Sequence, residues 1–126
     1  MNTILVVDDS PLVRDLINQV LSEKGITILE ASNGREALDI LKKIKPSLIL
    51  LDIMMPEMDG ISFMQEFVKI KGYENIPVIV LTALSERSLI DKIRAFGVKD
   101  VLFKPFSPAK LRTTIQQYLK QGKSKV

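Results

Sequence analysis

The fold is decided by the stretch ILVVDDSPLV, which occupies residues 4–13. Its four leading apolar residues have the length and composition of a strand that is buried on both faces of a parallel sheet. Two acids follow, and then Ser10 and Pro11 place a capping hydroxyl before a proline at the first position of a helix. The stretch therefore predicts a buried strand, an acidic loop and a helix, in that order.

The alternation of strand and helix continues along the chain. Short apolar runs recur at residues 48–51, 78–81 and 101–103, and the more alternating segment 26–31 is typical of an edge strand. Helical stretches lie between these runs. Strand and helix alternating five times predict right-handed crossovers and a doubly wound α/β fold with a parallel sheet.

The helices are predicted from apolar residues on one side and from local start and stop signals. The apolar side of the first helix is assigned to Leu12, Leu16 and Val20. That of the fourth is assigned to Leu89, Ile93 and Phe96. Capping residues predict where helices begin, and glycines predict where they end. The caps are Ser10, Asn33 with Glu36, Asp59, Ser85 and Ser107, and the stops are Gly25 and Gly97.

Composition limits the class of protein. The 126 residues fit one domain, and 46% hydrophobic with 26% charged residues is ordinary for a globular chain. The absence of Cys and His excludes thiol enzymes, Ser-His hydrolases and most zinc enzymes. No apolar run reaches the roughly 18 residues of a membrane span, and no signal-peptide pattern precedes the first strand. We therefore expect a cytoplasmic protein that does not bind a membrane.

The net charge of +3 comes from the end of the chain. Lys120, Lys123 and Lys125 lie in the last seven residues, and the rest of the chain carries equal numbers of basic and acidic residues. A basic end is typical of a solvated terminus, and no helix-turn-helix or aromatic-basic pattern accompanies it. We expect no direct binding to nucleic acid, and we divide the chain into a domain of residues 1–120 and a basic tail of residues 121–126.

Polar residues gather where the predicted strands end. Asp8 and Asp9 follow the first strand, Asp52 ends the third, Thr82 ends the fourth and Lys104 ends the fifth. In a doubly wound sheet, ligand sites lie beyond the carboxyl ends of the strands. We therefore expect these five side chains to meet at one edge of the sheet.

Three carboxylates in one cleft repel one another unless a cation lies among them. Mg²⁺ suits such a site, because it binds through one or two carboxylates with water and phosphate oxygens completing its shell. With Lys104 as a second cation and Thr82 as a hydroxyl donor, the set fits phosphoryl transfer to a carboxylate nucleophile. Each residue alone is also a common turn or capping residue, so the prediction depends on their coincidence at one edge.

Four motifs resemble those of response-regulator receiver domains, the CheY-like family. They are ILVVDDS (residues 4–10), LDIMMPEMDG (51–60), VLTA (80–83) and FKPF (103–106). The resemblance covers the chain to about residue 120. It implies a five-stranded parallel sheet in the order 2-1-3-4-5 with five helices, and a signalling switch that assists its own phosphorylation and dephosphorylation without being an enzyme.

The resemblance also implies a role for each site residue. Asp52 would accept a phosphoryl group from a phosphohistidine on a sensor histidine kinase or a histidine phosphotransfer protein. Mg²⁺ would be bound by Asp9 directly, by Asp8 largely through water, by Asp52, and by the backbone carbonyl of Met54. Lys104 would pair with Asp52 and then with the phosphoryl group, and its peptide bond to Pro105 would be cis. Thr82 would swing toward the phosphoryl group, and the small Ala83 would leave the site open.

One position departs from the family pattern. Where the family usually has Tyr or Phe three residues before the lysine, this chain has Val101. Phosphorylation does not need that ring, so the departure bears on the coupling from the site to the distant surface. Phe103 lies on the same strand face and is a candidate replacement. Met54 and Leu84 are apolar at the positions flanking the site, which predicts a long-lived aspartyl phosphate.

We expect the protein to act through other proteins, as a monomer or weak dimer. A downstream target would bind the surface of the fourth helix, fifth strand and fifth helix, while Val13 and Arg14 on the first helix are candidates for the kinase-docking face. Three other functions stay open. They are an unphosphorylated receiver-like scaffold, a phosphatase that forms an aspartyl phosphate, and a flavodoxin-like cofactor binder, whose phosphate the acidic loop after the first strand would repel.

Overall fold

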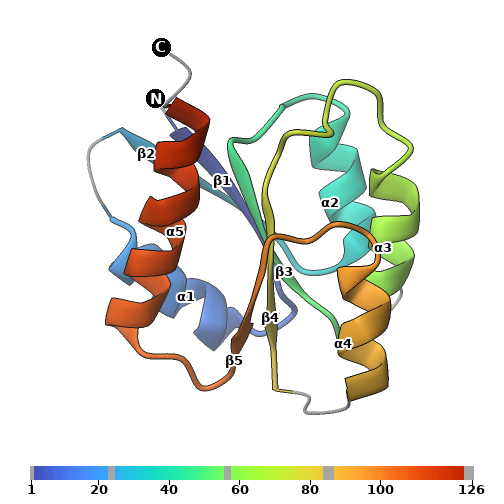
Figure 1. The fold of residues 1–126 in the computed structure, drawn as a ribbon. Helices are drawn as coiled ribbons and strands as arrows, with labels where there is room; N and C mark the ends of the chain where they lie inside the picture. The colour runs from blue at the N-terminus through green and yellow to red at the C-terminus, as the bar shows by residue number, and fades with distance from the viewer. Residues whose placement is uncertain (1, 23–24, 56–57, 84–86, 124–126) are drawn as a thin grey trace.

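The computed structural model describes residues 2–22, 25–55, 58–83 and 87–123, with side chains up to residue 119. Within these residues, five strands alternate with five helices (Figure 1). The strands are β1 (Asn2–Val7), β2 (Ile26–Ala31), β3 (Leu48–Asp52), β4 (Val78–Thr82) and β5 (Asp100–Phe103). The helices are α1 (Pro11–Val20), α2 (Gly34–Leu41), α3 (Gly60–Phe67), α4 (Arg87–Arg94) and α5 (Pro108–Lys123).

The five strands form one parallel sheet in the order β2-β1-β3-β4-β5. This order confirms the predicted doubly wound fold. β1 and β3 are neighbours, with Val7 in register with Leu51, so the residues that follow β1 lie beside the end of β3. At the other side of β3, Asp52 is in register with Leu81 of β4. The strand ends that carry the predicted site therefore share one edge.

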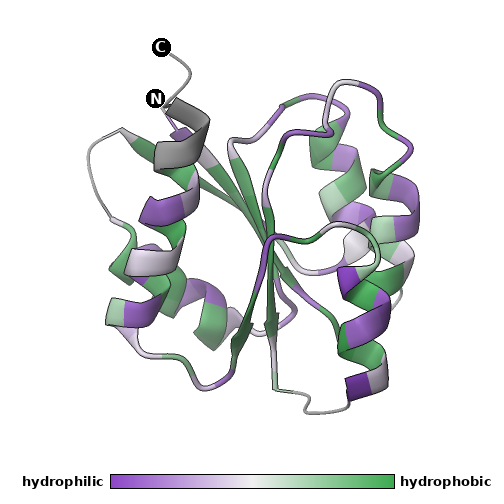
Figure 2. Cartoon of the chain, in the orientation of Figure 1, coloured by the Kyte–Doolittle hydropathy of each residue, from purple (hydrophilic) through white to green (hydrophobic). Residues whose placement is uncertain are grey.

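Helices cover both faces of the sheet (Figure 1). α1 and α5 pack on one face, and α2, α3 and α4 pack on the other. Successive residues of β1 alternate between the two cores: Ile4 and Val6 face α1 and α5, while Leu5 and Val7 face the other three helices. Figure 2 shows mainly hydrophobic strands at the centre, and helices in which hydrophobic and hydrophilic residues are mixed. Each fully buried aliphatic side chain contributes about 1.5–3 kcal/mol to this packing.

The predicted inner side of α1 is wrong at one position. Leu12 is 81% exposed, and the helix faces the sheet through Ile17 and Val20, with Val13 and Leu16 half-buried. At 3.6 residues per turn, Leu12 lies about 100° around the helix from the centre of this buried face. On α4, Ile90 and Ile93 are buried, Leu89 is half-buried, and Phe96 packs on the core beyond the end of the helix.

The described helix starts agree with the predicted caps. The side chains of Ser10, Asn33 and Asp59 accept the backbone N–H of the third residue after each of them. Ser107 likewise accepts the N–H of Lys110 at 3.0 Å. Ser85 lies outside the described residues. The predicted boundary at residue 120 falls inside α5, which continues to Lys123. No helix within the described ranges is long and apolar enough to cross a membrane.

Candidate functional site

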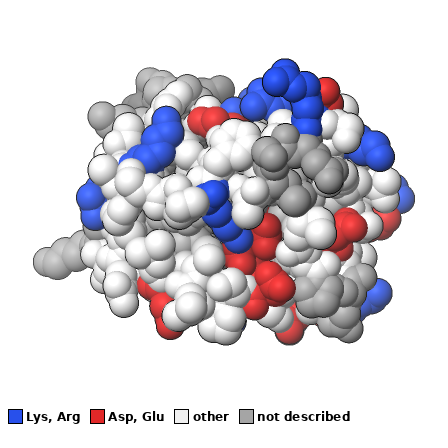
Figure 3. Space-filling view, turned by 90° about the horizontal axis from the view of Figure 1, so that it is seen from below, with Lys and Arg blue, Asp and Glu red and all other residues white. Residues whose placement is uncertain are grey.

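Three carboxylates meet at the carboxyl end of the sheet. Asp8 and Asp9 follow β1, Asp52 is the last residue of β3, and each offers an oxygen within 4.8 Å of the others. Asp8 is completely buried, Asp52 is 5% exposed and Asp9 is exposed. Seen from this end of the molecule, acidic side chains gather near the middle of the face, with a basic side chain directly beside them (Figure 3). The structure thus brings together the acids that the sequence predicted.

Asp8 is held from several directions. Its backbone N–H donates to the carbonyl of Ala31 at 3.0 Å, which continues the β1–β2 ladder by one residue. One carboxylate oxygen, Oδ1, accepts the N–H of Ser10 at 2.9 Å, and the other, Oδ2, accepts from Nζ of Lys104 at 2.8 Å. A buried carboxylate is costly unless it is paired and hydrogen-bonded. These contacts allow Asp8 to lie in the interior.

Lys104 reaches the acids from the end of β5. Its backbone N–H donates to the carbonyl of Thr82 at 2.7 Å, and its peptide bond to Pro105 is cis, the isomer that the resemblance implies. The ammonium lies 2.8 Å from Asp8 and 3.5 Å from Oδ2 of Asp52. The lysine therefore contacts both carboxylates and is nearer to Asp8, whereas the family resemblance implied a pairing with Asp52.

Electrostatics raises the pKa of the Asp52 carboxyl to about 6. Burial is the largest cause, and the negative charge of Asp8 adds to it, with a smaller addition from Asp9. Lys104 and the backbone N–H of Met54 act in the opposite direction. The charges of Asp8 and Asp9 therefore raise the pKa of Asp52 in spite of Lys104, and a cation bound among the three acids would lower it.

The donor set fits a hard divalent cation. All three side-chain donors are carboxylate oxygens, the ligand type that Mg²⁺ prefers. Mg²⁺ holds its ligands at about 2.1 Å, so oxygens on opposite sides of the ion are about 4.2 Å apart. A spread of up to 4.8 Å suits an ion that binds some carboxylates directly and another through water.

Comparison with known proteins identifies the family. A sequence profile described as the response regulator receiver domain matches residues 4–116. The chain belongs to the response-regulator receiver family. Sporulation initiation phosphotransferase F of Bacillus subtilis is 39% identical over 116 residues, which cover 92% of each chain. Chemotaxis protein CheY of Thermotoga maritima is 35% identical, over 86% of this chain and 89% of the relative.

Other relatives are longer than this receiver. The probable transcriptional regulator ycf27 of Porphyra purpurea is 42% identical over 121 residues, and the chain spans about half of that relative's length. Among solved structures, the Vibrio cholerae chemotaxis protein CheY4 is 31% identical with a TM-score of 0.86, over 94% of this chain and 98% of that one. A CheY-like receiver from Methanospirillum hungatei gives a TM-score of 0.91 at 23% identity, a likeness of fold alone.

The receiver's remaining predicted residues lie around the acids. Thr82 is completely buried at the end of β4, and Ala83 after it is exposed. Met54 is 59% exposed beside Asp52, and Leu84 lies outside the described residues. Thr82 is in register with Phe103, so the end of β4 lies between the acidic site and β5, the edge strand of the sheet.

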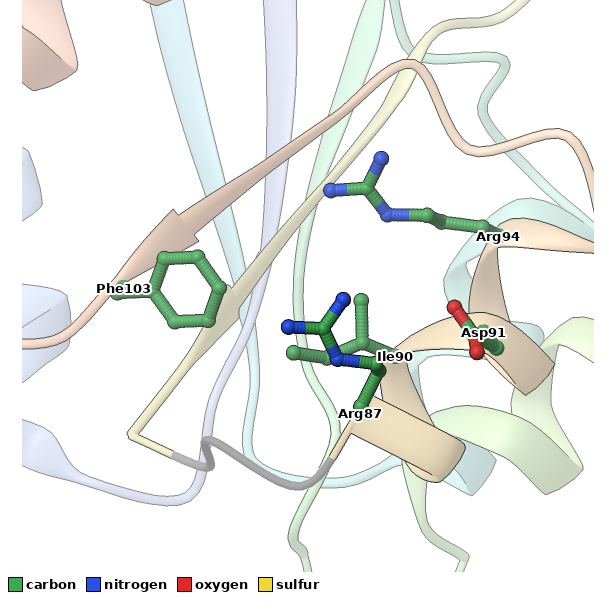
Figure 4. Close-up of a pocket in the computed structure, with 5 residues that line it drawn as sticks. All are labelled: Arg87, Ile90, Asp91, Arg94 and Phe103. Carbon is green, nitrogen blue, oxygen red and sulfur yellow. The ribbon is translucent and has the colours of Figure 1, made fainter.

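Val101 and Phe103 point to the α4 side of the sheet. Val101 is buried, whereas Phe103 is 50% exposed and lines a groove of about 400 Å³ with residues of α4 (Figure 4). In that view the guanidinium groups of Arg87 and Arg94 point across the groove toward β5. An aromatic ring therefore lines the α4–β5 surface of this receiver, two residues beyond the position where the family usually has one.

Sequence reasoning missed Gly60 as a residue of the site. Its N–H donates to the carbonyl of Ile53 at 2.8 Å, which closes the loop after β3 onto the start of α3. A Cβ at this position would lie 2.7 Å from the carbonyl oxygen of Asp52 and 2.8 Å from Cα of Ile53. Only glycine fits there without moving Asp52, and the pair Asp59–Gly60 at the helix start was the available signal.

Proposed function

We propose that this receiver accepts a phosphoryl group from a phosphohistidine donor onto the carboxylate of Asp52, with Mg²⁺ bound at the three acids. The observation that carries the proposal is the convergence of Asp8, Asp9 and Asp52 within 4.8 Å, beside the ammonium of Lys104. Asp9 and Asp52 would hold the ion directly, Asp8 largely through water, and the carbonyl of Met54 would add a ligand. When bound, the ion neutralises charge on the phosphoryl oxygens.

The transfer needs little chemistry from the protein beyond a placed nucleophile. An oxygen of Asp52 forms a bond to phosphorus while the bond between phosphorus and the donor imidazole nitrogen breaks. The imidazole takes the electron pair of that bond and a proton from solvent. Because the pKa of Asp52 is about 6, the carboxylate is mostly in its ionised, nucleophilic form at neutral pH.

Lys104 and Thr82 would then bind the new phosphoryl group. Lys104 already lies between the acids, and a phosphoryl group on Asp52 would offer it oxygens with more negative charge than the carboxylate. Thr82 would donate its hydroxyl from the end of β4. Thr82 is in register with Phe103, which lines the groove between α4 and β5, so a movement of Thr82 would act on the neighbouring strand at this groove.

The partners follow from this scheme. The donor would be a sensor histidine kinase or a histidine phosphotransfer protein, and the output would be a protein that reads the surface of α4, β5 and α5. We propose that the receiver works in the cytoplasm, as a monomer or weak dimer.

A phosphorylation assay tests the proposal. The protein is incubated with MgCl₂ and acetyl phosphate, and its intact mass is compared with that of Asp52→Asn under the same conditions. We expect the mass of one phosphoryl group in wild type, no gain in the variant, and no gain in wild type when EDTA replaces MgCl₂. Wild type that stays unmodified would support the unphosphorylated scaffold instead, and steady turnover of a generic phosphate ester would support the phosphatase.

A further inference from the structure

Arg14 binds the peptide unit that joins Asp8 to Asp9. Its Nη1 donates to the backbone carbonyl of Asp8 at 2.6 Å, and its Nε donates to Oε1 of Glu30 at 2.8 Å. These contacts leave only 18% of the arginine side chain exposed. The sequence made Arg14 a candidate for the kinase-docking face, but in the structure its guanidinium is engaged with the acidic loop and with β2.

Glu30 anchors the arginine. It lies on β2 in register with Val6, so its side chain rises on the α1 side of the sheet just before β1 ends. Its second oxygen accepts from Nδ2 of Asn18 at 2.9 Å, and the same Nδ2 group donates to the carbonyl of Arg14 at 3.0 Å. The arginine is thus fixed between α1, β2 and the loop after β1, and its planar fork suits two acceptors at once.

Asp9 depends on this peptide unit more than Asp8 does. Both carboxylate oxygens of Asp8 are hydrogen-bonded, to Ser10 and to Lys104. The carboxylate of Asp9 is exposed, and makes no hydrogen bond or ion pair to any residue that the structure describes. Its position therefore follows from its own backbone. Rotation of the peptide plane between the two residues would swing the Asp9 carboxylate away from the other two.

We propose that Arg14 is a positioning residue for the cation site. By holding the Asp8 carbonyl, it fixes the peptide plane that directs Asp9 toward Asp8 and Asp52. This inference rests on the proposed function, because it takes Mg²⁺ as the ion that the three acids bind. Residues that orient metal ligands from outside the first coordination shell typically change metal affinity 10–100-fold when they are replaced.

A purely structural role for Arg14 predicts a different result. An ion pair at a partly exposed surface stabilises a fold only slightly, and its loss would leave Mg²⁺ affinity unchanged. A positioning role predicts weaker Mg²⁺ binding with little change in melting temperature. The two roles separate when affinity and stability are measured on the same variants.

The test compares Arg14→Gln, Arg14→Lys and Glu30→Gln with wild type. Arg112→Gln is the matched control, because Arg112 also donates to a backbone carbonyl, that of Val20 at the far end of α1. Backbone amide shifts during a MgCl₂ titration give the dissociation constant, and thermal unfolding gives the melting temperature. We expect Arg14→Gln to raise the dissociation constant about tenfold or more. Arg14→Lys should also bind Mg²⁺ weakly, because an ammonium group does not reproduce the planar guanidinium that donates to Glu30 and to the Asp8 carbonyl.

Glu30→Gln should weaken Mg²⁺ binding less than Arg14→Gln does, and Arg112→Gln should match wild type. If wild type binds Mg²⁺ and Arg14→Gln binds it equally well, this inference fails while the proposed function stands. If wild type does not bind Mg²⁺, both fail. Should Arg14→Gln not fold, Glu30→Gln decides: affinity equal to wild type overturns the inference, and weaker affinity at an unchanged melting temperature supports it.

Discussion

Lys104 lies closer to Asp8 than to Asp52, with its Nζ 2.8 Å from the first carboxylate and 3.5 Å from the second. Asp8, which is completely buried, therefore has the shorter ion pair, and Asp52, which is 5% exposed, has the longer one. This arrangement leaves Asp52 as the carboxylate whose oxygens are less occupied by the protein. It also makes Lys104 a structural partner of Asp8 before any phosphoryl group is present.

Replacing Lys104 should destabilise the protein. In Lys104→Met, the side chain keeps its length, but the buried Asp8 carboxylate loses its cation, which should cost about 1–3 kcal/mol in the free energy of unfolding. Urea unfolding at pH 7 in EDTA measures this loss, and saturating MgCl₂ should reduce it. Lys69→Met removes an exposed ion pair with Glu66 and should change stability by less than about 0.5 kcal/mol. Equal midpoints for the two variants would contradict this role of Lys104.

Ionisation of Asp52 should destabilise the fold. Its pKa rises from 3.8 to about 6 on folding, so the unfolded chain loses this proton first. The stability that the neutral carboxyl contributes at low pH is lost as pH rises from about 4 through 6. Asp52→Asn avoids this loss and should be about 1–3 kcal/mol more stable than wild type at pH 7.5 in EDTA.

Urea unfolding at pH 4 and pH 7.5 checks the dependence on Asp52. The difference between Asp52→Asn and wild type should be small at pH 4, should grow toward pH 7.5, and should shrink again when MgCl₂ is added. Asp15→Asn, which changes an exposed carboxylate of α1, should show no such growth. A constant difference at both pH values would mean that burial does not raise the pKa of Asp52.

The sheet could be predicted from sequence because its central strands are buried on both faces. Continuous apolar runs such as residues 48–51 and 78–81 leave few alternatives to a parallel sheet covered by helices. The acids could be predicted because they interrupt those runs at the strand ends. In both cases the order of neighbouring residues is enough to predict which segments lie side by side in the fold.

Three features could not be read from the sequence. The exposure of Leu12 depends on how α1 is rotated on the sheet, and the adjacent apolar residues Leu12 and Val13 fit either rotation. The preference of Lys104 for Asp8 depends on fractions of an ångström. The contact of Arg14 uses a backbone carbonyl as acceptor, and every residue has one, so no residue type signals it.

Gly60→Ala should displace Asp52. The added methyl group would lie 2.7 Å from the Asp52 carbonyl, and overpacking of this kind costs about 1–3 kcal/mol. We expect lower stability and slower phosphorylation by acetyl phosphate, measured by intact mass over time. Gly97→Ala is the control, since Gly97 has a φ of 87° but nothing near its would-be Cβ. It should lose stability from backbone strain and keep the wild-type phosphorylation rate; a normal rate in Gly60→Ala would contradict the close approach.

The aspartyl phosphate should be long-lived. Met54 is apolar and 59% exposed beside Asp52, and an apolar side chain there neither orients nor activates the water that would hydrolyse the phosphoryl group. The double variant Met54→Asn, Leu84→Glu should lose its phosphoryl group several-fold faster than wild type, measured by intact mass after removal of the donor. A variant that keeps its phosphoryl group as long as wild type, or longer, would show that these side chains do not control access of water.

Phe103 should couple the phosphorylation site to the groove between α4 and β5. Its backbone is in register with Thr82, and its half-exposed ring lines that groove. Beryllofluoride with MgCl₂ mimics the phosphoryl group, and in wild type it should shift backbone amide resonances both around Asp52 and along α4. In Phe103→Ala the shifts around Asp52 should remain, because the acids are untouched, and those along α4 should largely disappear. Phe103→Leu, which keeps apolar bulk without a ring, should retain part of them. If the amide shifts along α4 are the same in Phe103→Ala as in wild type, Phe103 does not couple the phosphorylation site to the groove between α4 and β5.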